Sequence, residues 1–180
     1  TMWQRLTESA EKFNEPGRFT ALIGFEWTLM PDGKNLHRNV LFRDGKDKAD
    51  QIIPASAYDF QDPEKLWTWM GNYERKTGGK LLAIPHNGNI SNGLMFDDKT
   101  LESGKAFDRG YAERRSRWEP LYEVTQIKGD TEAHPFLSPN DEFANFEIWD
   151  KANLDGSTAK TREMLQYEYS REALKNGLAL

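Results

Sequence analysis

The spacing of hydrophobic residues changes several times along the chain and predicts helices alternating with strands. Residues 2–13 carry apolar side chains at helical spacing, which predicts an amphipathic helix. Asp62-Pro63 is a favourable helix start, and Gly78-Gly79 ends that helix after about Thr77. Residues 98–117 predict two short helices broken at Gly104, and residues 157–176 predict one long helix capped by Gly177.

Four apolar runs are short enough to be strands, at residues 19–27, 37–43, 81–84 and 121–127. Continuous apolar character between turn-forming residues is typical of a strand that is buried on both faces, as in a parallel sheet covered by helices. Residues 37–85 then form a strand, loop, helix, strand crossover, and residues 45–50 form a charged, solvated loop. We therefore expect an α/β fold in a single domain over residues 1–180.

Net charge, cysteine content and the length of apolar runs limit the binding partners and the environment that this chain can have. The formal net charge is −5 and the pI about 5.3, which argues against a nucleic-acid backbone as partner. There is no cysteine, so disulfides and thiolate metal sites are excluded. No apolar run approaches the roughly 20 residues that span a bilayer, so we expect a soluble protein, cytoplasmic or exported. Both ends look cut within a longer chain, and we expect an internal fragment.

Side chains that can bind a metal ion or act in catalysis lie at the predicted strand ends. All three histidines, His37, His86 and His134, lie at or beside such ends, and Glu26 closes the first strand between Phe25 and Trp27. A carboxylate in apolar surroundings needs a cation or a metal ion as partner. Two imidazoles and a carboxylate suit zinc, manganese or iron. The competing interpretation is that each histidine is hydrogen-bonded in a turn and has no ligand.

Three strings make the sequence recognisable: GFEWT at residues 24–28, IPHNGN at 84–89 and EVTQIKGDTEAHP at 123–135. Together with residues 36–42, they resemble the domain of unknown function family 3604, a bacterial branch that looks like the PHP (polymerase and histidinol phosphatase) metallohydrolases. The resemblance covers nearly the whole chain. It implies a distorted β/α barrel of mostly parallel strands, with metal ions at the carboxyl ends of the strands, that hydrolyses phosphate esters.

The resemblance also implies roles for individual residues. Glu26 corresponds to the bridging carboxylate, and His37 and His86 correspond to metal-binding histidines. The ion is zinc or manganese by preference, with iron or magnesium as alternatives. The family's His-x-His and Asp-x-His motifs have no counterpart in this chain, so we expect an open, partial barrel that is inactive as truncated. Candidate substrate-binding residues are Asn87, Lys128, Glu132 and His134, of which Glu132 and His134 suit an exposed turn equally well.

Two hypotheses follow. The first is a fragment of a metal-dependent hydrolase that acts on a small-molecule ester through metal-activated water. The second is a non-catalytic module that binds a ligand such as a saccharide in an aromatic groove, with structural histidines. The tryptophans Trp27, Trp67, Trp69, Trp118 and Trp149 favour core packing over a sugar platform. A truncated barrel exposes strand edges, so we also expect a homo-oligomer formed through an exposed sheet edge.

Overall fold

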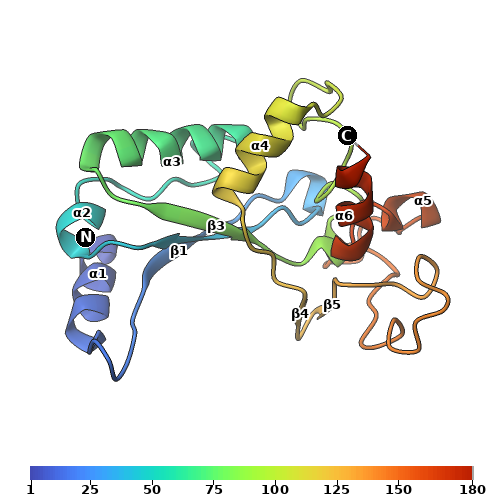
Figure 1. Ribbon diagram of the computed structural model, residues 1–180, viewed down its shortest axis with the longest axis horizontal. Coiled ribbons are helices and arrows are strands. Elements are labelled where there is room, and N and C mark those ends of the chain that lie inside the picture. Colours follow the sequence, from blue (N-terminus) through green and yellow to red (C-terminus); the bar gives the residue numbers. More distant parts are fainter. Residues whose placement is uncertain (180) are drawn as a thin grey trace.

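A computed structural model describes residues 1–179. It contains a three-stranded sheet, built from β1 (Ile23–Trp27), β2 (Arg38–Phe42) and β3 (Leu81–Pro85). Helices α3 (Pro63–Thr77) and α4 (Arg109–Trp118) lie along one side of this sheet (Figure 1). The result is a mixed helix and strand fold, as expected for an α/β class.

The sheet is antiparallel throughout, so the predicted parallel arrangement is wrong. β2 lies between β1 and β3, with Trp27 opposite Arg38 and Arg38 opposite Pro85. β1 and β3 therefore point the same way and β2 runs against both. The described residues form no closed barrel, and the segment between β2 and β3 is not a parallel crossover. Short apolar runs do not reveal strand direction, because burial on both faces occurs in either type of sheet.

Buried and less buried side chains alternate along the strands, so the sheet has one face in the core and one more open face. Trp27, Val40, Phe42 and Ala83 are fully buried. They belong to one core cluster with Leu66, Trp67, Met70 and Tyr73 of α3. The intervening positions, Gly24, Glu26, Asn39, Leu41, Leu82 and Ile84, are only partly buried or exposed. Because side chains alternate between faces, the two sides of this sheet have different chemistry.

The amino-terminal helices follow the local sequence signals. α1 (Met2–Phe13) begins with a capping box formed by Thr1 and Gln4. α3 begins at the predicted Asp62 cap, whose side chain accepts from Glu64 N, and ends at Gly78 in the left-handed conformation. The charged stretch at 45–50 contains a single helical turn, α2 (Lys46–Ala49), where we predicted a loop.

The carboxyl-terminal half departs further from expectation. Only one helix, α4, forms within residues 98–117, and residues 121–127 contribute just β4 (Thr125–Gln126), paired with β5 (Gly129–Asp130). Leu121 and Ile127 are 55% and 100% exposed, so this run is not a buried strand. The predicted long helix is divided into α5 (Arg162–Leu165) and α6 (Ser170–Leu178), and α6 continues through Gly177.

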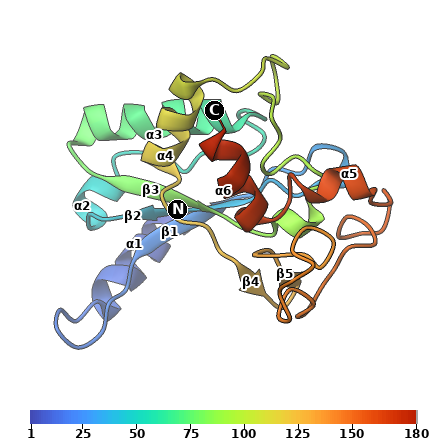
Figure 2. The ribbon, with the colours of Figure 1, turned by 45° about the vertical axis from the view of Figure 1, so that its right-hand side comes forward.

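Figures 1 and 2 show the β4–β5 hairpin on the side of the sheet opposite α3 and α4. Two short 3-10 turns complete the structure, η1 (Pro31–Gly33) before β2 and η2 (Gly88–Ile90) after β3. Trp27, Trp67 and Trp118 are buried in the core, as predicted, whereas Trp149 is 43% exposed. None of the helices formed by residues 1–179 is long and apolar enough to cross a membrane.

Candidate metal centre

Three residues from the three strands meet at one end of the sheet. Glu26 is the fourth residue of β1, His37 immediately precedes β2, and His86 immediately follows β3. The antiparallel order brings the carboxyl ends of β1 and β3 to the amino end of β2. The His86 backbone N–H also donates to His37 O at 3.4 Å, which continues the pairing by one residue. Sheet register thus assembles residues that are up to 60 positions apart.

The Glu26 carboxylate lies between the two imidazoles. Its Oε1 is 3.0 Å from His37 Nδ1 and 2.9 Å from His86 Nε2. The two rings are edge to face, with centroids 5.8 Å apart. One ligand atom from each residue lies within 4.8 Å of the others. Tetrahedral ligands at typical zinc distances are about 3.3 Å apart, so small side-chain adjustments are sufficient to surround an ion.

Burial favours ligand chemistry at both histidines, and a lowered pKa favours it at His37. His37 and His86 are 8% and 3% exposed. Burial lowers the pKa of His37 although the Glu26 carboxylate opposes this, so the imidazole lone pair stays available near neutral pH. His86 Nδ1 is 3.4 Å from Ile84 O, which orients Nε2 towards Glu26. A backbone carbonyl at the far nitrogen is a common support for a metal-binding histidine.

Glu26 connects the cluster to solvent, since 44% of its side chain is exposed. Burial would raise the pKa of Glu26, but His37 and His86 together hold it below its ordinary value. His37 Nε2 is buried and has no hydrogen-bond partner among residues 1–179. Two imidazoles in contact with one ionised carboxylate fit a divalent ion. Glu26, His37 and His86 therefore form a cluster that could hold a metal ion.

The other predicted site residues divide into two groups. Asn87 follows His86 directly and is 1% exposed. Lys128 lies in the β4–β5 turn, near enough for its positive charge to contribute to the lowered pKa of His37. Glu132 instead pairs with Arg171 at 2.6 Å on the surface. His134 Nε2 is 3.2 Å from Asp150, and its Nδ1 accepts from Phe136 N. Both nitrogens of His134 are satisfied away from the cluster.

Residues from distant parts of the chain hydrogen-bond the backbone of the loop that follows His86, and no local sequence pattern predicts these contacts. Asn35 Nδ2 donates to His86 O at 2.9 Å, and the Tyr122 hydroxyl accepts from Gly88 N at 2.9 Å. Burial raises the pKa of Tyr122 to about 12, so the hydroxyl stays protonated. These partners lie far from His86 in sequence, so local patterning could not identify them.

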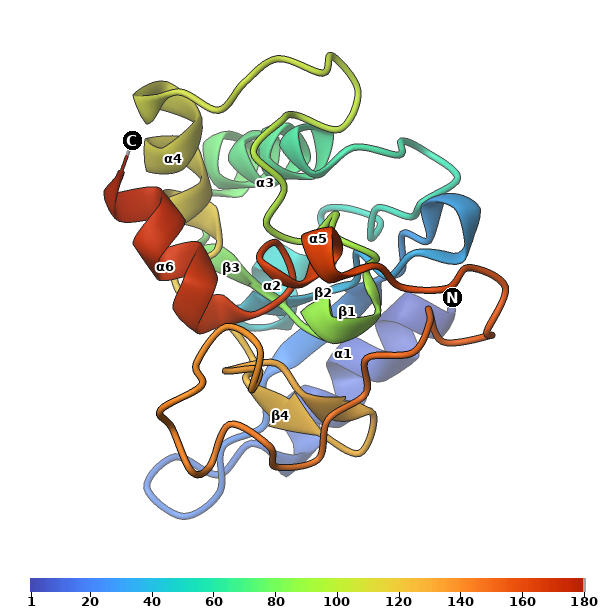
Figure 3. The same ribbon diagram turned by 90° about the vertical axis from the view of Figure 1, so that its right-hand side faces the viewer.

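A buried ion pair holds the same loop from the carboxyl-terminal side. Lys160 and Glu168 are separated by 2.9 Å, and their side chains are 1% and 0% exposed. Lys160 also donates to Asn89 O, and Glu168 accepts from Gly93 N at 3.1 Å. In Figure 3, α5 and the chain that leads into it lie beside η2. Burial lowers the pKa of Lys160 and raises that of Glu168, each opposed by its partner.

A second buried network lies behind β2. The Glu119 carboxylate accepts from Arg38 Nε at 3.0 Å, Trp67 Nε1 at 2.9 Å and Arg115 Nε at 3.1 Å. Burial would raise the pKa of Glu119, but the two guanidinium groups hold it below its ordinary value. Because Arg38 follows His37, this network anchors the amino end of β2 to α3 and α4.

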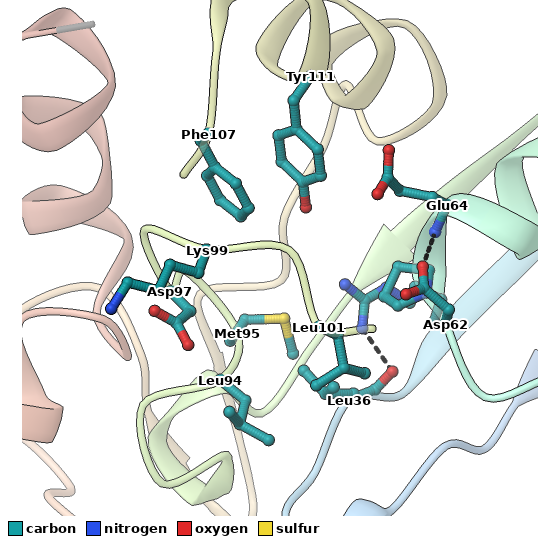
Figure 4. Close-up of a pocket in the computed structure, with 12 residues that line it drawn as sticks. Leu36, Asp62, Glu64, Leu94, Met95, Asp97, Lys99, Leu101, Phe107 and Tyr111 are labelled. Carbon is teal, nitrogen blue, oxygen red and sulfur yellow. Dashed lines mark hydrogen bonds between the residues drawn. The ribbon is translucent and has the colours of Figure 1, made fainter. Parts of the chain in front are cut away.

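A small cavity lies beside this network, and the side chains that line it do not form a catalytic site. It encloses about 20 Å³, room for one water molecule. Figure 4 shows Asp62 accepting from Glu64 N. Arg38, which also lines the cavity, donates to Leu36 O. Its polar side chains thus cap α3 and fix Arg38, so we assign the cavity a structural role.

A larger groove of about 780 Å³ lies between α4 and α6. Aromatic side chains line it, namely Phe96, Phe107, Tyr111, Tyr122 and Tyr167. No residue of the metal-site cluster contributes to this groove. It is therefore separate from the candidate metal centre.

No protein of curated function and no solved structure matches the chain. The sequence matches a family model over its whole length, residues 1–180. The chain belongs to the family described as Protein of unknown function (DUF3604).

Proposed function

We propose that this chain carries a divalent metal site of a PHP-like metal-dependent hydrolase that acts on phosphate or related esters. The observation that supports the proposal most directly is the contact of the Glu26 carboxylate with both His37 and His86. The resemblance of the GFEWT and IPHNGN strings to PHP-like proteins supplies the reaction class. By that resemblance the other metal ligands belong to His-x-His and Asp-x-His motifs, which have no counterpart among residues 1–180.

Each residue has a role in this proposal. Glu26, His37 and His86 would hold zinc or manganese, and an ion bound there would supply activation of water and polarisation of an ester oxygen. The half-exposed Glu26 gives a ligand access from solvent. The ammonium group of Lys128 adds positive charge near His37, which favours an anionic ester. Glu132 and His134 have partners elsewhere, so we assign them no role in substrate binding.

Metal analysis of single variants tests the proposal. The unaltered chain should retain zinc or manganese after dialysis, and His86→Ala should abolish tight retention, because two remaining protein ligands rarely hold a first-row metal. His134→Ala is the matched control, since His134 is equally buried but pairs with Asp150 away from the cluster. Unchanged metal content in His86→Ala, measured by elemental analysis, would falsify the ligand assignment.

The aromatic groove supports a second candidate function. Its volume of about 780 Å³ lies within the range of small-molecule sites, and aromatic side chains stack on sugar rings. In this alternative the chain is a ligand-binding module, and the histidines are structural. A protein that binds no metal, and whose tryptophan or tyrosine fluorescence changes on saturation with an oligosaccharide, would favour the groove over the cluster.

A further inference from the structure

Unsatisfied polar atoms concentrate at the end of the sheet that carries the cluster. His37 Nε2 and both amide atoms of Asn87 are buried without a hydrogen-bond partner among the described residues. His37 lies next to the row in which Trp27, Arg38 and Pro85 pair across the strands, and Asn87 lies two positions beyond it. Buried polar groups in proteins are nearly always paired, so such a concentration indicates a place for a ligand.

Asn87 is the most unusual of these residues. Its side chain is buried, yet neither the oxygen nor the nitrogen of its carboxamide is paired. Its φ of 55° is in the left-handed region, which a residue other than glycine adopts at a cost. Strain and unsatisfied polarity at one residue are typical of positions kept for binding.

The backbone around Asn87 is firmly held, so this is not a loosely packed loop. Asn35 Nδ2 donates to Asn87 O at 3.3 Å, and Gly88 N donates to the Tyr122 hydroxyl. Lys160 and Glu168 fix Asn89 and Gly93 further along. Within this segment neither amide atom of Asn87 has a partner, whereas Asn89 and Asn92 each lack one only at Oδ1.

The charge near the cluster favours an anion. Lys128 forms no ion pair with a carboxylate in the part of the chain that the structure describes. Its backbone is fixed by Asn89 Nδ2, which donates to Lys128 O at 2.9 Å. An unpaired ammonium group and a bound divalent ion together attract an oxyanion.

We propose that Asn87 determines which oxyanion this site accepts, by hydrogen-bonding an oxygen that carries a proton. The carboxamide nitrogen donates and the carboxamide oxygen accepts, so only a ligand with a protonated oxygen satisfies both. Hydrogen phosphate has such an oxygen near neutral pH, whereas sulfate does not. The inference rests on the proposed function, because it needs the ion held by Glu26, His37 and His86.

Calorimetric titration of the zinc-loaded chain with inorganic phosphate and with sulfate tests this. The unaltered protein should bind phosphate about tenfold more tightly than sulfate, the value of one hydrogen bond to a charged group. Asn87→Gly should bring the two affinities within about twofold of each other. Glycine adopts a positive φ without strain, so the loop can keep its conformation.

Asn92→Gly is the matched control. Asn92 lies in the same loop, has a φ of 49° and is 5% exposed, but its Nδ2 donates to Thr158 O. This variant should keep the preference for phosphate. Thermal unfolding gives a second readout, since Asn87→Gly removes no hydrogen bond and should lower the midpoint less than Asn92→Gly.

The outcomes separate this inference from the proposed function. Equal affinities for phosphate and sulfate in the zinc-loaded, unaltered chain would overturn the role of Asn87 and leave the metal site intact. A preference for phosphate that survives in Asn87→Gly would do the same. Failure of the unaltered chain to bind zinc would overturn the proposed function and this inference together.

Discussion

Gly88 follows His86 and Asn87 and lies against two groups from distant parts of the chain. A Cβ at this position would collide with the Tyr122 hydroxyl and with the backbone carbonyl of Glu168. The absence of a side chain therefore lets the loop approach both supports. A single glycine thus links the candidate metal ligand His86 to the carboxyl-terminal half of the molecule.

Replacing this glycine should affect both stability and metal binding. Gly88→Ala should destabilise the fold by about 1–3 kcal/mol through overpacking and weaken zinc affinity because the loop that carries His86 must move. Gly177→Ala is the control, since Gly177 lies in α6 with open space around it, and helix propensity predicts a gain of about 0.5–1 kcal/mol. Urea unfolding with zinc titration measures both effects, and normal zinc affinity in Gly88→Ala would contradict this account.

At the scale of elements, the helices with the strongest local signals were predicted, whereas features that depend on distant parts of the chain were not. The helices at residues 2–13 and 63–77 were predicted because their caps and apolar spacing are local. Strand direction was missed because it depends on the path of the chain between strands. The resemblance allowed Glu26, His37 and His86 to be proposed together from sequence, and the antiparallel course of β2 is what places His37 beside the carboxyl ends of β1 and β3.

The division of the predicted long helix has a physical cause. Glu168 lies between α5 and α6, and its carboxylate turns inward to Lys160 and Gly93 N. A continuous helix over residues 157–176 would also have to include the irregular stretch at 157–161, from which Lys160 reaches Asn89. Tertiary pairing of two buried charges therefore overrides helix propensity, which is a weak preference.

Breaking the Lys160–Glu168 pair should lower the free energy of unfolding far more than breaking an ion pair on the surface. Lys160→Met leaves the Glu168 carboxylate buried without its partner and should destabilise the fold by about 3–5 kcal/mol. Lys175→Met is the control, because Lys175 is 55% exposed and its pair with Glu172 should contribute less than about 1 kcal/mol. Denaturant unfolding distinguishes them, and the double variant Lys160→Met, Glu168→Leu should recover most of the loss. Similar costs for both lysines would show that the buried pair does not hold the loop.

At the scale of the whole molecule, Glu119 joins β2, α3 and α4 through Arg38, Trp67 and Arg115. Because its pKa is lower in the folded chain than in the unfolded one, Glu119 stabilises the fold above its ordinary pKa of 4.5. This contribution is lost as the pH falls through the folded-state pKa. The network therefore makes the core sensitive to acid.

Substitution of this carboxylate should reveal the pH dependence. Glu119→Gln leaves two buried guanidinium groups without their counter-ion and should cost about 3–5 kcal/mol at neutral pH. The difference from the unaltered protein should shrink progressively below pH 4.5. Glu113→Gln, on the exposed side of α4, should show neither effect. Thermal unfolding as a function of pH provides the measurement, and a difference that is constant from neutral to acidic pH would rule out the low pKa.

The edge of the sheet formed by β1 lacks the usual protection against strand pairing. β1 is the terminal strand, so one side of its backbone has no strand partner among residues 1–179. It contains neither proline nor lysine, and the neighbouring Phe19 and Leu22 are 59% and 56% exposed. Edges without such protection pair readily with a second strand. We therefore predict that this chain associates with a second copy along β1, which extends both sheets.

Sedimentation velocity over a range of concentrations tests this association. The sedimentation coefficient should rise with concentration for the unaltered chain, and Leu22→Lys should suppress the rise, because a charge beside the edge opposes pairing. Ile53→Lys is the control, since Ile53 is 83% exposed and lies outside the sheet. A monomer at every concentration would show that side chains around β1 already protect the edge, and equal suppression by both variants would point to general charge repulsion instead of strand pairing.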